Sequence, residues 1–281
     1  MHFNLEAKLA YLKPGTVYKD PVTVTILNAR QQQLPPWQRI NFELLSHETM
    51  VTDWNDSKQL LNLFYEEIAE ISLKQSGADI VTIGELPFIR KSPKEFDEDC
   101  TGLYHEIDYD DHDIPITLIH SDFAPNYVEL IEKRHSNPDK YIGNYFGKFC
   151  RDKKFEHLKF TDAKRIMVLN FWKNIGPEVM DFPLAICDPY SVTQQEVRSI
   201  PIHKFSYFDT LGLQSGCHKH HRWYYWPGMN INEILMFKTF DTGVQEHEPY
   251  WVFHGAFRDP TVKLNQPARI SIEARVNCFF F

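Results

Sequence analysis

One histidine in the sequence is followed two residues later by a carboxylate, in His120–Ser121–Asp122. With 38 acidic residues in 281 and 13 histidines, roughly two such pairs would arise by chance, so the spacing alone predicts no function. Its context is informative, because it ends an apolar run over 114–119 that predicts a strand. Side chains two apart on a strand point the same way, so His120 and Asp122 would share one face. They would then form half of the 2-His-1-carboxylate site of non-haem Fe(II) oxygenases.

A third ligand and an anion receptor follow in the C-terminal part of the chain. His254 lies in the aromatic run 251–257, which predicts a strand, and Arg269 and Ser271 are two apart on the last predicted strand, 269–281. An arginine beside a hydroxyl suits a carboxylate, because its charge-assisted hydrogen bonds can be bidentate. His254 alone would fit a packed core histidine equally well. Along the chain, His120 and Asp122 come first, then His254, and then Arg269 with Ser271. This order favours an iron site.

A rival metal site is the cluster Cys217–His218–Lys219–His220–His221. Zinc prefers cysteine and histidine ligands, but a structural zinc site normally takes ligand pairs from two separate segments. No second Cys/His pair at such spacing exists in the sequence. The sequence therefore favours a loop that happens to be rich in histidine, and whether this cluster binds a metal stays open.

The elements that would position these residues are mostly strands. A helix is predicted over 57–75, because its apolar residues fall on one face and Gly77 stands where a C-terminal cap belongs. A mostly helical insert is predicted over 125–160, and the acidic segment 96–113 is expected to be a solvated loop. The many strands with long connections predict an antiparallel sandwich or barrel. The predicted strands span 22–27, 79–84, 114–119, 166–172, 183–187, 221–226, 234–240, 251–257 and 269–281.

The composition disfavours several classes of partner. The formal net charge of −8 disfavours a nucleic-acid partner, and no apolar run approaches the ~20 residues of a membrane span. The N-terminal sequence lacks the pattern of a signal peptide. Five scattered cysteines predict reduced thiols, and so a cytoplasmic protein. The sequence has no Gly-x-Ser-x-Gly, P-loop or dinucleotide-binding motif, which disfavours hydrolase and nucleotide-dependent functions.

Five longer segments of the chain are specific enough to compare with known families. They are Asn170–Pro177, Pro183–Asp188, His221–Tyr225, Asn232–Lys238 and Arg269–Arg275. In these segments, and in His120–Ser121–Asp122, the chain resembles the fungal hydroxylase/desaturase family that includes AsaB-like enzymes and the fungal gibberellin desaturase. The bacterial cephamycin protein CmcJ is a more distant relative. The resemblance runs through nearly the whole chain.

The resemblance implies an Fe(II)/2-oxoglutarate-dependent oxygenase, with O2 as the second co-substrate. His120, Asp122 and His254 would be the iron ligands, and Arg269 with Ser271 would hold the far carboxylate of 2-oxoglutarate. The expected reaction is hydroxylation, desaturation or oxidative cyclisation at an unactivated C–H bond of a small molecule in fungal secondary metabolism. A non-catalytic accessory barrel that acts beside a partner enzyme is the alternative.

The resemblance also implies a mainly β fold, with a double-stranded β-helix (jelly-roll or cupin-like) core. We expect a single domain over 1–281, in which a strand and helix extension over 1–104 packs on the core over 105–281. A homodimer is the default oligomeric state. The family usually has arginine where Lys173 stands. Candidates to contact the substrate are Phe123, Trp172, Lys173, Arg222, Trp223, Tyr224 and Arg275.

Overall fold

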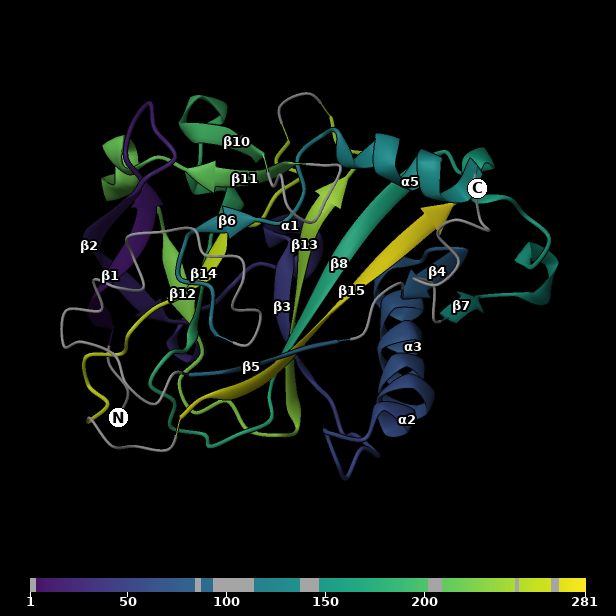
Figure 1. Cartoon of the computed structure of the whole chain (residues 1–281), viewed down its shortest axis with the longest axis horizontal. Helices are drawn as coiled ribbons and strands as arrows, with labels where there is room; N and C mark the ends of the chain where they lie inside the picture. The colour runs from purple at the N-terminus through teal and green to yellow at the C-terminus, as the bar shows by residue number, and fades with distance from the viewer. Residues whose placement is uncertain are drawn as a thin grey trace.

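The computed structural model describes residues 4–83, 87–92, 114–136, 147–201, 209–245, 248–263 and 268–281. The acidic segment 96–113 and the middle of the predicted insert lie outside the described residues. The described part is mainly β, with two sheets side by side and one long helix against the second sheet (Figure 1). A mainly β architecture with helical additions therefore agrees with the sequence-based expectation.

The first sheet has eight strands, in the order β1-β2-β12-β9-β14-β6-β11-β10. All its neighbours are antiparallel except β2 and β12, which are parallel. The sheet curls, because isolated bridges join Ala10 of β1 to Leu118 and Leu12 to Gln214 near the other end. Its strands are β1 (Leu5–Leu12), β2 (Lys19–Asn28), β6 (His120–Ser121), β9 (Leu184–Cys187), β10 (Val197–Pro201), β11 (Asp209–Leu213), β12 (Trp223–Tyr225) and β14 (His254–Ala256).

The second sheet has the order β3-β13-β8-β15-β4-β7, and β5 pairs with β15 beside this path. Its two longest strands are β8 and β15, which run antiparallel over ten paired residues from Ser271↔Asn174 to Phe280↔Arg165. The strands are β3 (Phe42–Ser46), β4 (Ile80–Ile83), β5 (Phe88–Lys91), β7 (Gly147–Cys150), β8 (Arg165–Asn174), β13 (Glu233–Asp241) and β15 (Ile270–Phe280).

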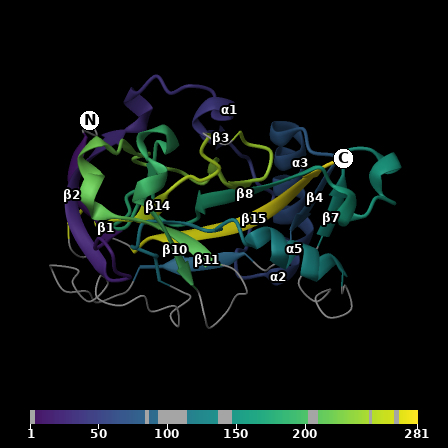
Figure 2. The same cartoon turned by 90° about the horizontal axis from the view of Figure 1, so that it is seen from above.

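The helix predicted over 57–75 is confirmed, and it runs from Ser57 to Ser76 with a π-helical turn inside it. The Asp56 side chain accepts a hydrogen bond from the Lys58 N–H at its start. Gly77 ends it with a φ of 70°, a left-handed conformation that favours glycine. Figure 2 shows α3 beside β4 and β15, at the end of the molecule opposite β1 and β2. The helices are α1 (Trp37–Ile40), α2 (Ser57–Gln59), the π-turn η2 (Leu60–Phe64), α3 (Tyr65–Ser76) and α5 (Tyr127–Ser136).

The alternation of β15 separates the two faces of the second sheet. Ile272, Ala274 and Val276 belong to the apolar core beneath α3. The residues between them, Glu273 and Arg275, point to the opposite face, because successive side chains of a strand alternate. That face looks toward the first sheet, since Arg275 donates a hydrogen bond to Asp122 just after β6. The space between the sheets is therefore lined by polar side chains along β15.

Three elements predicted from the sequence differ in the structure. The strand predicted over 114–119 does not form; β6 is only two residues long, and Pro115 can donate no hydrogen bond to a sheet. The strand predicted over 251–257 shortens to β14. The insert over 125–160 contains the expected helix, α5, but its described part also includes strand β7 on β4 and two short 3-10 turns, η4 (Lys153–Phe155) and η5 (Phe160–Asp162).

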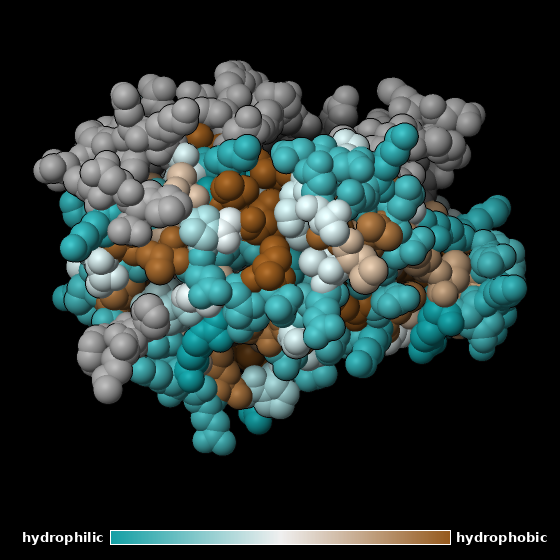
Figure 3. Space-filling model, turned by 90° about the horizontal axis from the view of Figure 1, so that it is seen from below, coloured by the Kyte–Doolittle hydropathy of each residue, from teal (hydrophilic) through white to brown (hydrophobic). Residues whose placement is uncertain are grey.

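The surface seen from below is mostly hydrophilic, with apolar groups gathered near its middle (Figure 3). Among the described residues, no helix combines the length and the apolar character that a membrane crossing requires.

The remaining short 3-10 segments are η1 (Ala29–Gln31), η6 (Pro189–Ser191), η7 (Gln194–Glu196) and η8 (Ser215–His220).

Candidate metal centre

His120 and His254 lie directly opposite each other on the antiparallel strands β6 and β14. Their ring centroids are 4.5 Å apart. Each Nδ1 lies beside the carbonyl oxygen of the residue two positions earlier in the chain, that of Leu118 at 2.7 Å and that of Val252 at 3.0 Å. A carbonyl oxygen only accepts hydrogen bonds, so a neutral imidazole places its proton on Nδ1. Both Nε2 lone pairs are thereby left for another partner.

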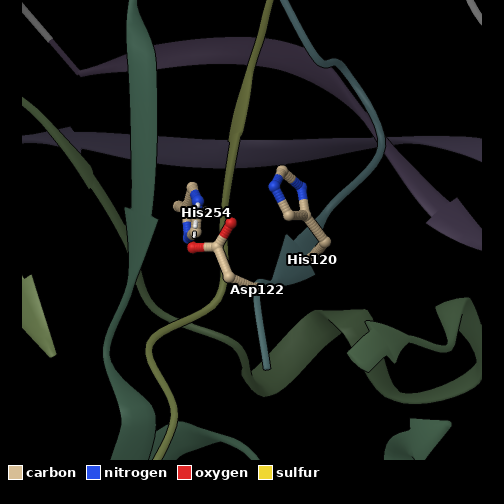
Figure 4. A group of neighbouring side chains, drawn as sticks. All are labelled: His120, Asp122 and His254. Carbon is tan, nitrogen blue, oxygen red and sulfur yellow. Dashed lines mark ion pairs between the residues drawn. The ribbon is translucent and has the colours of Figure 1, made fainter. Parts of the chain in front are cut away.

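Asp122 completes a group of three on the same side of the first sheet (Figure 4). One carboxylate oxygen of Asp122 and one nitrogen of each histidine all lie within 4.8 Å of one another. The Asp122 Oδ2 atom is 3.7 Å from Nε2 of His254. All three residues are buried. The pair His120 and Asp122 therefore shares a face, as the spacing of two along a strand predicts.

The second sheet holds the Asp122 carboxylate through both of its oxygens. Arg275 of β15 donates from Nη2 to Oδ1 at 2.6 Å, and Asn170 of β8 donates from Nδ2 to Oδ2 at 2.6 Å. Asn170 and Arg275 face each other across the two strands. Burial by itself would raise the pKa of Asp122, but Arg275, the two histidines and Asn170 together hold it well below its usual range. Asp122 is therefore an anion at neutral pH.

The electrostatics keep His120 neutral. Burial, and then the neighbouring His254, lower the pKa of His120 to about 4. Two imidazoles and one carboxylate are the donor set that suits non-haem Fe(II). The hydrogen bonds from the Nδ1 atoms and to the carboxylate are the outer contacts that orient such ligands. The residues present thus fit an iron ion.

Arg269 is buried, with 2% of its surface exposed, directly before β15. Its Nε donates to Ser271 Oγ at 2.9 Å and its Nη1 to the Phe182 carbonyl oxygen at 2.9 Å. The guanidinium stacks over the Trp172 ring at 5.0 Å. Burial lowers the pKa of Arg269 to about 9, so it remains a cation at neutral pH. Within the described part of the chain, its Nη2 makes no hydrogen bond and is left for a ligand.

Arg269 and the iron-type ligands lie along one face of β8. Asn170, which contacts Asp122, and Trp172, which contacts Arg269, are two residues apart on that strand and share a face. Two residues of a strand span ~7 Å. The structure thus brings Arg269 and Ser271 to the same inter-sheet space as the three ligand-type residues.

The structure brings four of the seven predicted substrate residues toward this space. Phe123 follows Asp122, stacks on Tyr127 at 4.0 Å and lies 5.7 Å from the Arg275 guanidinium. Trp172 lies against Arg269, and Arg275 binds Asp122. Tyr224 pairs with Ile186, which pairs with His254, so these side chains share a face of the first sheet.

The other three predicted residues lie elsewhere. Lys173 is fully buried on the opposite face of β8 from Trp172, where its ammonium contacts Nδ1 of His47 at 3.1 Å and three carbonyl oxygens. Arg222 is more than half exposed and pairs with Asp188. Trp223 points into the core of the curled sheet and donates to the Tyr11 hydroxyl. Strand alternation explains this, since Lys173 and Trp223 each adjoin a residue that faces the site.

Sequence reasoning missed Asn170 and Phe237. The ring of Phe237, on β13, lies 4.6 Å from the His254 ring. Asn170 was marked in the sequence only as the one polar residue within the apolar run 166–172. Phe237 carried no such signal, because aromatic residues are common throughout the predicted strands.

The family model described as "Oxidoreductase/YMDC permease-like domain" matches residues 2–279. The chain belongs to this family. One curated relative is the alpha-ketoglutarate-dependent dioxygenase phiK from a fungal species. It is 25% identical to this chain, over 85% of this chain and 77% of the relative. The hydroxylase/desaturase efuI of Hormonema carpetanum is 25% identical over 92% of this chain and 83% of the relative. The predicted resemblance to fungal hydroxylase/desaturases is confirmed.

Among solved structures, an iron and alpha-ketoglutarate-dependent endoperoxidase, NvfI, superimposes on this chain with a TM-score of 0.72. The match covers 99% of this chain and 98% of the other, at 18% sequence identity. The curated relatives include a protein of the same name, the Fe(II)/2-oxoglutarate-dependent dioxygenase nvfI of Aspergillus novofumigatus, 23% identical over 87% of this chain and 80% of the relative. At this identity the structural match establishes the fold, and it confirms the predicted double-stranded β-helix.

Proposed function

We propose that this chain is a non-haem Fe(II)/2-oxoglutarate-dependent dioxygenase, with His120, Asp122 and His254 as the iron ligands. The observation that carries the proposal is the state of the ligand atoms. Both histidines have Nδ1 engaged by a backbone carbonyl, so both Nε2 lone pairs are free beside an ionised carboxylate. Relatives named as dioxygenases of this kind support the same activity. When bound, iron supplies O2 activation coupled to decarboxylation of 2-oxoglutarate to succinate.

Arg269 and Ser271 would bind the far carboxylate of 2-oxoglutarate. The Arg269 guanidinium is already fixed by Ser271 Oγ, the Phe182 carbonyl and the Trp172 ring, so binding orders no further side chain. Such preorganisation favours affinity, because little conformational entropy is lost. The burial of this cation also strengthens its attraction for a carboxylate.

The aromatic side chains at the site would exclude water and hold a mostly apolar part of the substrate. Phe123 stands next to Asp122, Phe237 packs on His254, and Tyr224 lies on the same face two strands away. A dry site protects a reactive centre from side reactions. The substrate class we propose is a small molecule with an unactivated C–H bond, which is hydroxylated, desaturated or cyclised in fungal secondary metabolism. A cytoplasmic location, a homodimer and the single-domain division at residue 104 stay predictions from the sequence.

The test is succinate formation from 2-oxoglutarate in the presence of Fe(II) and O2. The wild-type chain should form succinate slowly even without the true substrate, and His254→Ala should reduce the rate to background. His157→Ala is the matched control, because His157 is exposed on the connection between β7 and β8 and lies outside the metal-type group. A non-catalytic accessory barrel predicts no succinate from any of the three proteins. Full turnover by His254→Ala would refute the ligand assignment.

A further inference from the structure

A second group of metal-ligand side chains lies at the base of the β10/β11 hairpin. Glu196 ends the 3-10 segment η7 just before β10. His220 ends the segment η8 that follows β11, and His221 comes directly after it. One carboxylate oxygen and one nitrogen from each histidine lie within 4.8 Å of one another. The backbone joins the same two segments, since the Gln214 N–H donates to the Glu196 carbonyl oxygen at 2.9 Å. None of these residues belongs to the proposed oxygenase site.

Two buried ligand atoms of this group have no hydrogen bond. The side chains of Glu196 and His221 are 6% and 0% exposed. Yet Glu196 Oε1 and His221 Nε2 form no hydrogen bond with any residue that the structure describes. They lie 3.0 Å from His220 Nε2 and 3.4 Å from Glu196 Oε2, respectively, without hydrogen-bond geometry. Buried polar atoms are nearly always bonded, so such an exception requires an explanation. A cation bound between them would satisfy both atoms.

Surrounding contacts aim these two atoms at the group. Thr193 donates to the other Glu196 oxygen, Oε2, from its N–H at 2.6 Å and from its hydroxyl at 2.9 Å. The His221 ring stacks on Tyr11, and its Nδ1 lies 3.1 Å from the Tyr11 hydroxyl. With a metal on Nε2, the Nδ1 proton would be donated to the Tyr11 oxygen, which has two lone pairs. This is the outer contact that orients metal-bound histidines.

The thiol of Cys217 also interacts with the Glu196 carboxylate. Cys217 is an exposed free cysteine in η8, and this contact raises the pKa of the thiol. The Cys217 sulfur lies outside the group of atoms that are all within 4.8 Å of one another, so it would have to approach the two imidazole nitrogens to complete a set of four donors. Zn²⁺ binds such mixed sets in tetrahedral geometry, whereas Mg²⁺ and Ca²⁺ prefer oxygen ligands.

We propose that Glu196, His220 and His221, with Cys217 as the fourth ligand, form a structural Zn²⁺ site that closes the base of the β10/β11 hairpin. The cysteine and the histidines come from one short segment, and Glu196 supplies the ligand from a second, separate segment. Because β11 pairs with β6 through Gly212 and His120, the site would also brace the neighbour of the proposed iron-binding strand.

The direct test is Co²⁺ titration, because a thiolate bound to Co²⁺ gives a charge-transfer band in the near ultraviolet. The titration uses metal-free His120→Ala/His254→Ala protein, which lacks the imidazoles of the proposed iron site. We expect one equivalent of Co²⁺ to bind with the thiolate band. Adding Cys217→Ser should remove the band, and adding His220→Ala should weaken binding at least about tenfold. Adding His218→Ala is the matched control and should change neither, since His218 instead contacts the Ser215 carbonyl.

A second measurement avoids the double variant in case it does not fold. The wild-type chain reloaded with excess Zn²⁺ and desalted should contain two zinc ions, since the proposed iron site also takes zinc, and His220→Ala should contain one. The substitution replaces a half-exposed side chain, so the fold should persist. Equal zinc content in the two proteins, or no stoichiometric Co²⁺ binding by the double variant, would overturn the site. A Co²⁺ band that survives Cys217→Ser, or binding without a thiolate band, would overturn Cys217 as the fourth ligand.

Discussion

The hydrogen bonds of His120 and His254 determine which nitrogen of each ring carries the proton. Each Nδ1 faces a backbone carbonyl oxygen that can only accept, so the Nε2 lone pair points at Asp122 and the other ring. At His221 the partner of Nδ1 is the Tyr11 hydroxyl, which can either donate or accept. The tautomer of the first pair is therefore already the one that the proposed metal binding requires. The second histidine can change its tautomer when a metal binds.

Asn170 should matter for iron affinity although it contacts no metal. It donates to the Asp122 oxygen nearest His254, so it holds the carboxylate in its orientation. Asn170→Ala should weaken Fe(II) binding by about 10–100-fold, the usual effect of losing an outer contact to a metal ligand. Isothermal titration under anaerobic conditions measures this. Fe(II) affinity within twofold of the wild-type value would contradict the positioning role of Asn170.

Replacing Arg269 even with lysine should weaken the binding of 2-oxoglutarate. A lysine keeps the charge but cannot donate to Ser271 and to the Phe182 carbonyl while presenting a further N–H to a ligand. We expect Arg269→Lys to raise the KM for 2-oxoglutarate by about 10–100-fold, because the loss of charge-assisted hydrogen bonds costs about 1.5–3 kcal/mol. Steady-state succinate assays across 2-oxoglutarate concentrations give this value. An unchanged KM would remove Arg269 from the co-substrate site.

At the scale of the element, strand β8 carries two functions on its two faces. Asn170 and Trp172 face the first sheet, whereas Leu169 and Phe171 pack in the core beneath α3. Periodicity predicted this strand and the last one. It could not predict which of two adjacent residues faces the site, because β8 is buried on both faces and its sequence does not alternate in polarity.

Adjacent substitutions on β8 should therefore separate stability from co-substrate binding. Lys173→Ala leaves buried carbonyl oxygens without their donor, so it should lower the free energy of unfolding by about 2–4 kcal/mol. Its succinate formation per folded molecule should stay near the wild-type value. Trp172→Ala should raise the KM for 2-oxoglutarate, because it removes the ring under Arg269. Urea unfolding and the succinate assay together decide the point; a loss of turnover in Lys173→Ala with normal stability would contradict it.

For the whole molecule, the sequence predicted the fold class better than it predicted the contacts between side chains far apart in the chain. The pairing of His120 with His254 joins residues 134 positions apart, and Arg275 reaches Asp122 from 153 positions away. Such contacts depend on how the two sheets meet, which local periodicity does not encode. The sequence also missed Glu196 beside the His220–His221 pair for the same reason.

The junction of β8 and β13 gives a prediction for the stability of the whole fold. Asp241 is buried, and burial alone would raise its pKa, but Arg165 and Lys238 hold it below its usual value. A carboxylate with a lowered folded pKa contributes stability above its unfolded pKa of about 4, and that stability is lost as the pH falls through the folded pKa. Asp241→Asn should lower the free energy of unfolding by about 2 kcal/mol at pH 7, less than for a fully buried pair because Arg165 is 39% exposed.

The check on Asp241 is a pair of urea unfolding series at different pH values. The difference between the wild-type protein and Asp241→Asn should shrink as the pH falls below about 4. A difference that is constant between pH 7 and pH 3 would show that the carboxylate charge does not contribute.

The central claim is that His120, Asp122 and His254 bind Fe(II) while Arg269 places 2-oxoglutarate beside it. An anaerobic visible absorption spectrum tests it directly, because 2-oxoglutarate chelated to Fe(II) gives a metal-to-ligand charge-transfer band that neither component gives alone. The wild-type chain should develop this band at one equivalent of iron, and His254→Ala should not. Absence of the band from the wild-type protein at saturating Fe(II) and 2-oxoglutarate would contradict the claim.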